Sequence, residues 1–246
     1  MELIQSVKID LSHSFVPKTL INYVVSRVRR GIGTLKTTSF AFPGVCLIVD
    51  ISGFTALSEG FCDAGKKGID GLQVCTNVFI GELVTVVHEF GGDIIKFAGD
   101  ALVCVFAEES NADVSIGKPT GNKKVSIDVL LRALQCAHQV SKIRTDRLTV
   151  HIGISCGDIC FGILGGVENR WECLISSPCM HQLSDCLDDA PSMQAVMTAD
   201  CWDVLKLHAT VQQDDSIGME AEDSVETLNI ETPLGKHTIS FHPLLS

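Results

Sequence analysis

VCLIVDI, residues 45–51, followed directly by SGFT, residues 52–55, is the stretch of sequence that decides the fold. The first part is almost continuously apolar and rich in β-branched residues, which is typical of a strand buried on both faces. Ser52 and Gly53 then favour the start of a short helix. Asp50 interrupts the apolar run, and burying a carboxylate costs several kcal/mol unless it is paired or bound to a metal.

Asp50 has two interpretations. In the first, it only ends the strand and helps to cap the following helix. In the second, residues 52–55 offer backbone N–H groups at a helix N-terminus to a phosphate, and Asp50 holds a metal ion beside that phosphate.

A second carboxylate follows in DIIKFAGDALVCVFA, residues 93–107, which predicts two short strands around a tight Gly99–Asp100 turn. Asp is common in turns, so Asp100 alone has an ordinary structural explanation. If its hairpin lies beside the strand of Asp50, the two carboxylates meet where two divalent cations can be held on a triphosphate. Lys96 is either a solvated lysine or a contact to a phosphate or base.

The rest of the chain predicts an α+β domain, an α/β sandwich whose antiparallel-rich sheet is covered by helices. No internal repeat is visible. Helices are expected at 15–28, 53–60, 69–90, 125–142, 178–189 and around Trp202; strands at 148–166, 171–176 and 194–197; surface loops at 108–124 and 214–226; and a final hairpin at 233–235.

The composition excludes several classes of protein. With 19 Lys and Arg against 30 Asp and Glu, the net charge is −11, so an extended surface for nucleic acid is not expected. The 11 cysteines form no CxxC pair and indicate reduced thiols in the cytoplasm or a similar compartment. Early charges break up any secretory signal, and we expect no transmembrane segment.

Two segments at the right separation carry a family resemblance: FPGVCLIVDISGFTALSEGF, residues 42–61, and EFGGDIIKFAGDALVCVF, residues 89–106. Together with LTVHIGISCGDICFGILGG, residues 148–166, they resemble the class III nucleotidyl cyclase catalytic domain, most closely the first catalytic domain of soluble, bicarbonate-responsive adenylyl cyclases. The core of the match covers 40–205. It implies a ferredoxin-type βαββαβ sheet, with an N-terminal helical segment at 1–40 and the catalytic domain at 41–246.

The resemblance also implies a site. Asp50 and Asp100 would be the catalytic, metal-binding aspartates, with the Ile51 carbonyl as a further ligand of two divalent cations, Mg²⁺, Mn²⁺ or Ca²⁺. Residues 52–55 would cradle the β- and γ-phosphates of ATP. The implied nucleotide-binding residues are Ile51, Ser52, Gly53, Phe54, Thr55, Lys96 and Gly99.

One departure from the family is visible. In the family a partner domain supplies an Asn and an Arg from a helix after the later strands, and the Arg stabilises the transferring phosphate. Here the corresponding segment is LISSPCMHQLSDCLDDA, residues 174–190, which contains neither residue type. The arginine that accompanies the lysine at position 96 in bicarbonate-responsive domains also has no counterpart there, which argues against bicarbonate as a ligand.

Two functions therefore remain open. The chain is expected to be the metal-binding half of an adenylate cyclase that converts ATP to cyclic AMP and pyrophosphate, with a second class III cyclase domain supplying Asn and Arg. Alternatively, it is a catalytically silent module that binds nucleotide or dimerises to regulate a partner cyclase. The two aspartates favour the first function, and the missing Asn and Arg favour the second. A guanylyl cyclase is the less favoured variant of the first.

Overall fold

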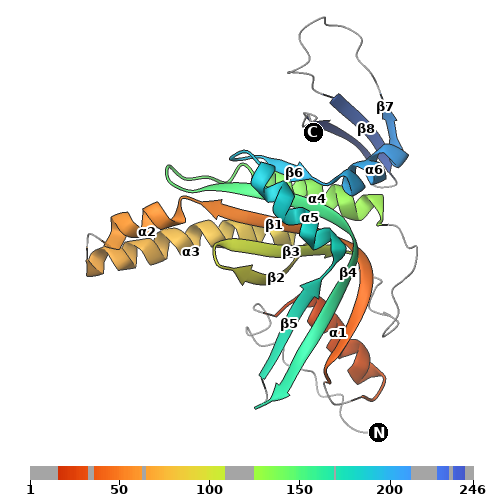
Figure 1. Ribbon diagram of the computed structural model, residues 1–246, viewed down its shortest axis with the longest axis horizontal. Coiled ribbons are helices and arrows are strands. Elements are labelled where there is room, and N and C mark those ends of the chain that lie inside the picture. The colour runs from red at the N-terminus through yellow and green to blue at the C-terminus, as the bar shows by residue number, and fades with distance from the viewer. Residues whose placement is uncertain are drawn as a thin grey trace, which may run out of the picture.

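A computed structural model describes residues 16–32, 36–62, 65–108, 125–168, 170–211, 226–232 and 235–241 (Figure 1). The loops expected at 108–124 and 214–226 lie almost entirely outside the described residues, as do the turn residues 233–234. The helices are α1 (Lys18–Arg29), α2 (Phe54–Cys62), α3 (Lys66–Glu89), α4 (Ile127–Val140), α5 (Pro178–Asp189) and α6 (Ala199–His208). The strands are β1 (Thr38–Ser52), β2 (Asp93–Ala98), β3 (Ala101–Ala107), β4 (Thr149–Val167), β5 (Arg170–Ser176), β6 (Ala195–Met197), β7 (Ala209–Val211), β8 (Glu226–Thr232) and β9 (Gly235–Phe241).

The main sheet has the strand order β2-β3-β1-β4-β5, and β6 pairs with β4. All neighbours are antiparallel except β4 and β6. The order of β1, two helices, β2, β3, α4 and β4 along the chain, with β1 and β3 at the centre, is the expected βαββαβ arrangement. Strands β7, β8 and β9 form a separate three-stranded sheet.

Strand β1 is buried on both faces because its alternate side chains belong to two hydrophobic clusters. Val45, Leu47 and Val49 face the cluster built with α2, α3, α4 and α6. Cys46 and Phe40 face the other cluster, to which α1 and α5 contribute. The expected doubly buried strand is confirmed, and it positions Asp50 on the face of α1 and α5.

Among the described helices, α3 has the length and the apolar composition that would allow it to cross a membrane. Its Phe79, Leu83 and Val87 are nevertheless buried in the cluster that includes the sheet. The helix therefore contributes one face to the core of this domain.

Candidate active site

The two candidate aspartates meet at one end of the sheet. Strand β1 pairs with β3 in a register that sets Asp50 opposite Ala101, the residue after Asp100. Asp50 is half-buried and Asp100 is exposed in the β2–β3 turn, which Gly99 makes possible with a φ of +68°. The sequence-based expectation that these two elements are neighbours is correct.

The electrostatics of Asp50 reflect this position. Burial raises the pKa of the Asp50 carboxyl above its ordinary value, the charge of Asp100 raises that pKa further, and His151 opposes the shift. The two carboxylates therefore repel each other, and a cation between them would relieve the repulsion.

Lys96 lies on the same face of the sheet as Asp50. It pairs with Val103, which pairs in turn with Ile48, two residues before Asp50. Residues directly opposite in an antiparallel ladder share a face, so Lys96 is one row of side chains away from the aspartates. Its side chain is exposed, and its charge is therefore available to an anion on this face.

Residues 51–55 form a sharp corner between β1 and α2. The side chain of Ile51 is buried in the core, Ser52 ends β1, and Phe54 begins α2 and packs against the core. Gly53 connects them with a φ of +92°, and a Cβ atom there would lie 2.1 Å from the carbonyl oxygen of Arg147. The corner thus depends on glycine, and it turns the N-terminus of α2 with exposed Thr55 to the end of β1.

The side chains present suit a cation only in part. Among the described residues there is no group of three or more His, Cys, Asp and Glu that could hold a metal ion. The two carboxylates nevertheless suit Mg²⁺, which proteins commonly bind through one or two carboxylates and the phosphates of a substrate. The donor set therefore fits a metal ion that arrives with a phosphate ligand.

His151 is a neighbour of the site that sequence reasoning missed. Strand β4 places it directly opposite Asp50. Its Nδ1 lies 2.6 Å from the carbonyl oxygen of Ala190, at the end of α5, which fixes the ring. Only the pairing register brings His151 to the site, and no local motif in the sequence signals it.

Helix α5, the segment in which the resemblance led us to look for an Asn and an Arg, packs closely on β4. Ser177 caps it by accepting a hydrogen bond from the Cys179 N–H, and Ser155 of β4 donates to the Cys179 carbonyl at 2.9 Å. A Cβ atom on Gly153 would lie 3.2 Å from the Leu183 carbonyl oxygen, so glycine permits this approach. The helix is well anchored, yet its sequence PCMHQLSDCLDD offers no Asn or Arg.

Comparisons with known proteins agree on the fold. No family model matches the sequence. The chain is 30% identical over 163 residues to adenylate cyclase type 10 of Mus musculus, a match that covers 65% of this chain and 10% of the length of that relative.

Two solved structures show similar folds. The adenylyl cyclase CyaB from P. aeruginosa is 19% identical, with a TM-score of 0.51 over 75% of this chain and 90% of that chain. The guanylyl cyclase Cya2 is also 19% identical, with a TM-score of 0.51 over 82% of this chain and 91% of that chain. One of these proteins is an adenylyl and the other a guanylyl cyclase, so the fold does not select the nucleotide.

Proposed function

Because the chain has the class III nucleotidyl cyclase fold and is similar in sequence to adenylate cyclase type 10, we propose that it is the metal-binding half of an adenylate cyclase site. The reaction is the conversion of ATP to cyclic AMP and pyrophosphate. The observation that carries the proposal is the meeting of Asp50 and Asp100 beside the N-terminus of α2, with Lys96 on the same face.

Each group has a role that follows from its chemistry. Asp50, Asp100 and the Ile51 carbonyl would hold two divalent cations, which lower the pKa of the ribose 3′-hydroxyl and stabilise the leaving pyrophosphate. The backbone N–H groups of residues 52–55 would orient the β- and γ-phosphates. Lys96 would bind a phosphate or the base, and Gly99 permits the left-handed turn that presents Asp100.

A complementary cyclase domain would complete the site. The 246 residues contain no Arg after Arg170 and no Asn between Asn169 and Asn229. Without an arginine to stabilise the transferring phosphate, catalysis typically falls by about 10³-fold or more. We therefore infer that Asn and Arg come from a second class III cyclase domain, on this or another chain, in the cytoplasm.

The test is cyclic nucleotide production from ATP or GTP with Mg²⁺ or Mn²⁺. The chain is assayed alone and mixed with a cyclase domain that carries the Asn and Arg, and both assays are repeated with Asp50→Ala. Asp203→Ala is the matched control, because Asp203 is an exposed aspartate on α6.

Cyclic AMP formed only in the mixture, lost with Asp50→Ala and retained with Asp203→Ala, supports the proposal. If cyclic GMP forms from GTP and no cyclic AMP forms from ATP, the chain is half of a guanylyl cyclase site. The absence of Asn and Arg from α5 favours a second candidate, a silent regulatory module. That function is indicated if the chain binds ATP with a divalent cation but forms no product in either assay.

A further inference from the structure

The outer face of α1 and the residues after it expose apolar side chains. The exposed fractions are 41% for Val25, 60% for Val28 and 40% for Ile32. Val25 and Val28 are three residues apart and therefore lie on one side of the helix. The chain folds back after Arg30, since the Ile32 N–H donates to the Arg27 carbonyl at 3.0 Å, so the exposed Ile32 stays close to the C-terminal turn of α1.

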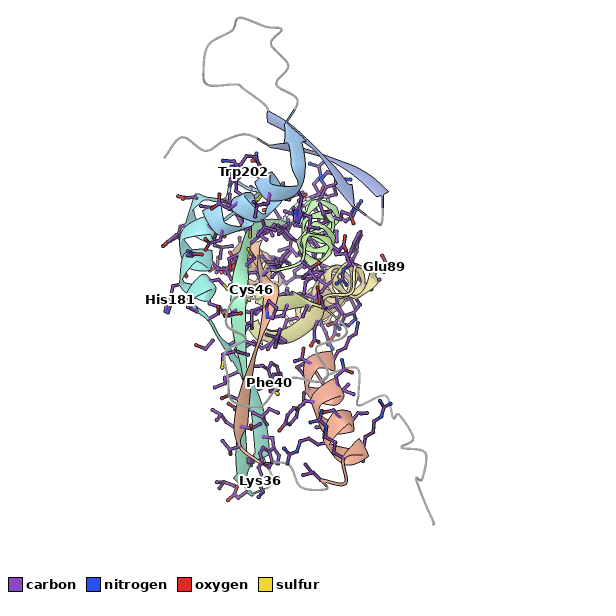
Figure 2. The ribbon with its side chains drawn as sticks, turned by 90° about the vertical axis from the view of Figure 1, so that its right-hand side faces the viewer. Lys36, Phe40, Cys46, Glu89, His181 and Trp202 are labelled. Carbon is purple, nitrogen blue, oxygen red and sulfur yellow. The ribbon has the colours of Figure 1, made fainter. Side chains whose placement is uncertain are left out.

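The opposite face of α1 is fixed to the domain. The Asp93 carboxylate accepts hydrogen bonds from the Lys18 and Thr19 N–H groups at 2.8 Å and 2.7 Å and from the Thr19 hydroxyl at 2.7 Å. Tyr23 is buried and stacks on Phe40 with ring centroids 5.2 Å apart. Figure 2 shows α1 beside the strand that carries Phe40, so the exposed apolar side chains are not on the core face of the helix.

The exposed charged side chains on α1 and in the described residues that follow it, up to Lys36, are basic. Residues 11–49 contain no Asp or Glu, although acidic residues outnumber basic ones by 30 to 19 in the whole chain. The exposed basic residues of this region are Lys18, Arg29, Arg30 and Lys36. Lys36 lies at the end of the molecule to which the C-terminal end of α1 also extends (Figure 2). The described part of residues 11–49 thus carries only basic charges, while the exposed acidic residues at the Lys36 end, Glu168 and Glu172, belong to the β4–β5 hairpin.

We propose that this surface, Val25, Val28, Ile32, Arg29 and Lys36, binds an anionic membrane surface. Exposed apolar residues flanked by Lys and Arg on a helix are the combination that inserts at the level of lipid headgroups. The chain's own acidic segment, 214–226, is the other candidate of opposite charge. Its flanking strands β7 and β8 lie at the far end of the molecule from α1 (Figure 1), which disfavours that contact within one chain.

The test is flotation of the full chain with vesicles of phosphatidylcholine alone or mixed with phosphatidylserine, at low and high salt. We expect binding only to the anionic vesicles, weakened by salt. The double variant Arg29→Glu/Lys36→Glu should reduce partitioning by at least about 25-fold, because each basic residue near such a surface contributes about fivefold and each new Glu is repelled. Val28→Ser should also weaken binding while leaving both charges in place.

The matched control is Lys142→Glu/Arg144→Glu, which reverses the charge of two exposed basic residues outside α1. It changes the net charge of the chain by the same amount and should leave partitioning within about twofold of wild type. Circular dichroism and thermal unfolding establish that all variants fold. Equal binding to neutral vesicles, equal loss in the control, or no binding to anionic vesicles would overturn the proposal. Salt-sensitive self-association that Arg29→Glu/Lys36→Glu abolishes, without vesicle binding, would assign the surface to the acidic segment of a second copy instead.

Discussion

Asp50 destabilises the folded domain at neutral pH in the absence of a cation. Its pKa is raised by burial first and by Asp100 second, so the folded state holds its proton to a higher pH than the unfolded state does. Stability is therefore highest below the ordinary carboxyl pKa and falls as the pH rises through the raised pKa. We expect Asp50→Asn to remove this fall and to raise the melting temperature at neutral pH.

Thermal unfolding without divalent ions, between about pH 4 and pH 8, measures this effect. Asp70→Asn is the control, since Asp70 is an exposed aspartate on α3 and no part of the site. A lower melting temperature for Asp50→Asn at neutral pH, with an unchanged pH dependence, would contradict the expectation.

Gly53 is the residue at which substitution should harm the corner most. Gly53→Ala places a Cβ 2.1 Å from the Arg147 carbonyl oxygen at a φ of +92°, so the strain should cost about 2 kcal/mol or more. Urea unfolding measures the loss. Gly81→Ala is the control, because nothing lies within 4 Å of its added Cβ and alanine in a helix should stabilise by up to about 1 kcal/mol. Equal effects at the two glycines would refute this account.

The positions of the two aspartates follow from local signals in the sequence, but the placement of Lys96 and His151 beside them does not. An Asp in an apolar strand and an Asp in a glycine turn are local signals. Lys96 reaches the face of Asp50 only because a register shift between Ile94 and Lys96 breaks the alternation of β2. Strict alternation would place Lys96 with Ile94 on the opposite face, which α2, α3, α4 and α6 cover. His151 likewise depends on a pairing register that no single strand encodes.

At the scale of elements, the Asp93 carboxylate anchors the N-terminal end of α1. Asp93→Asn removes the charge and one acceptor oxygen from a group that receives three hydrogen bonds. We expect a loss of about 1–3 kcal/mol in unfolding free energy and faster tryptic cleavage within α1. Glu89→Gln is the control, as it neutralises an exposed carboxylate at the end of α3. Unchanged cleavage of α1 in Asp93→Asn would contradict this role.

Most helices and strands can be predicted from the sequence, because the periodicity and the end signals that define them are local. Strand β1 is the exception in length: a strand was expected at 45–51, and the structure extends it back to Thr38. Pro43 argues against a central strand, since it lacks an N–H. It is tolerated because β3 pairs with β1 only from Gly44 onward, so Pro43 has a strand neighbour on one side, β4.

At the scale of the whole molecule, nucleotide and metal should bind together or not at all. The carboxylates need phosphate oxygens to complete a cation's ligands, and the phosphates need the cation to offset the charge of Asp50 and Asp100. Mn²⁺ with a non-hydrolysable ATP analogue at about 100 times Kd should therefore stabilise the fold by about 2.7 kcal/mol. We expect EDTA or Asp100→Ala to abolish the shift and Asp203→Ala to retain it. A full shift with nucleotide in EDTA would contradict this coupling.

The contact between Asp93 and α1 also has a mechanical consequence. Asp93 is the first residue of β2, the strand that carries Lys96 and leads through the Gly99 turn to Asp100. A force applied to the chain ahead of α1 therefore loads the three Asp93 hydrogen bonds before it loads the paired length of β1 and β4. If α1 is held on a fixed surface while the rest of the domain moves, the force is transmitted first to the β2–β3 hairpin, because Asp93 connects this hairpin to α1.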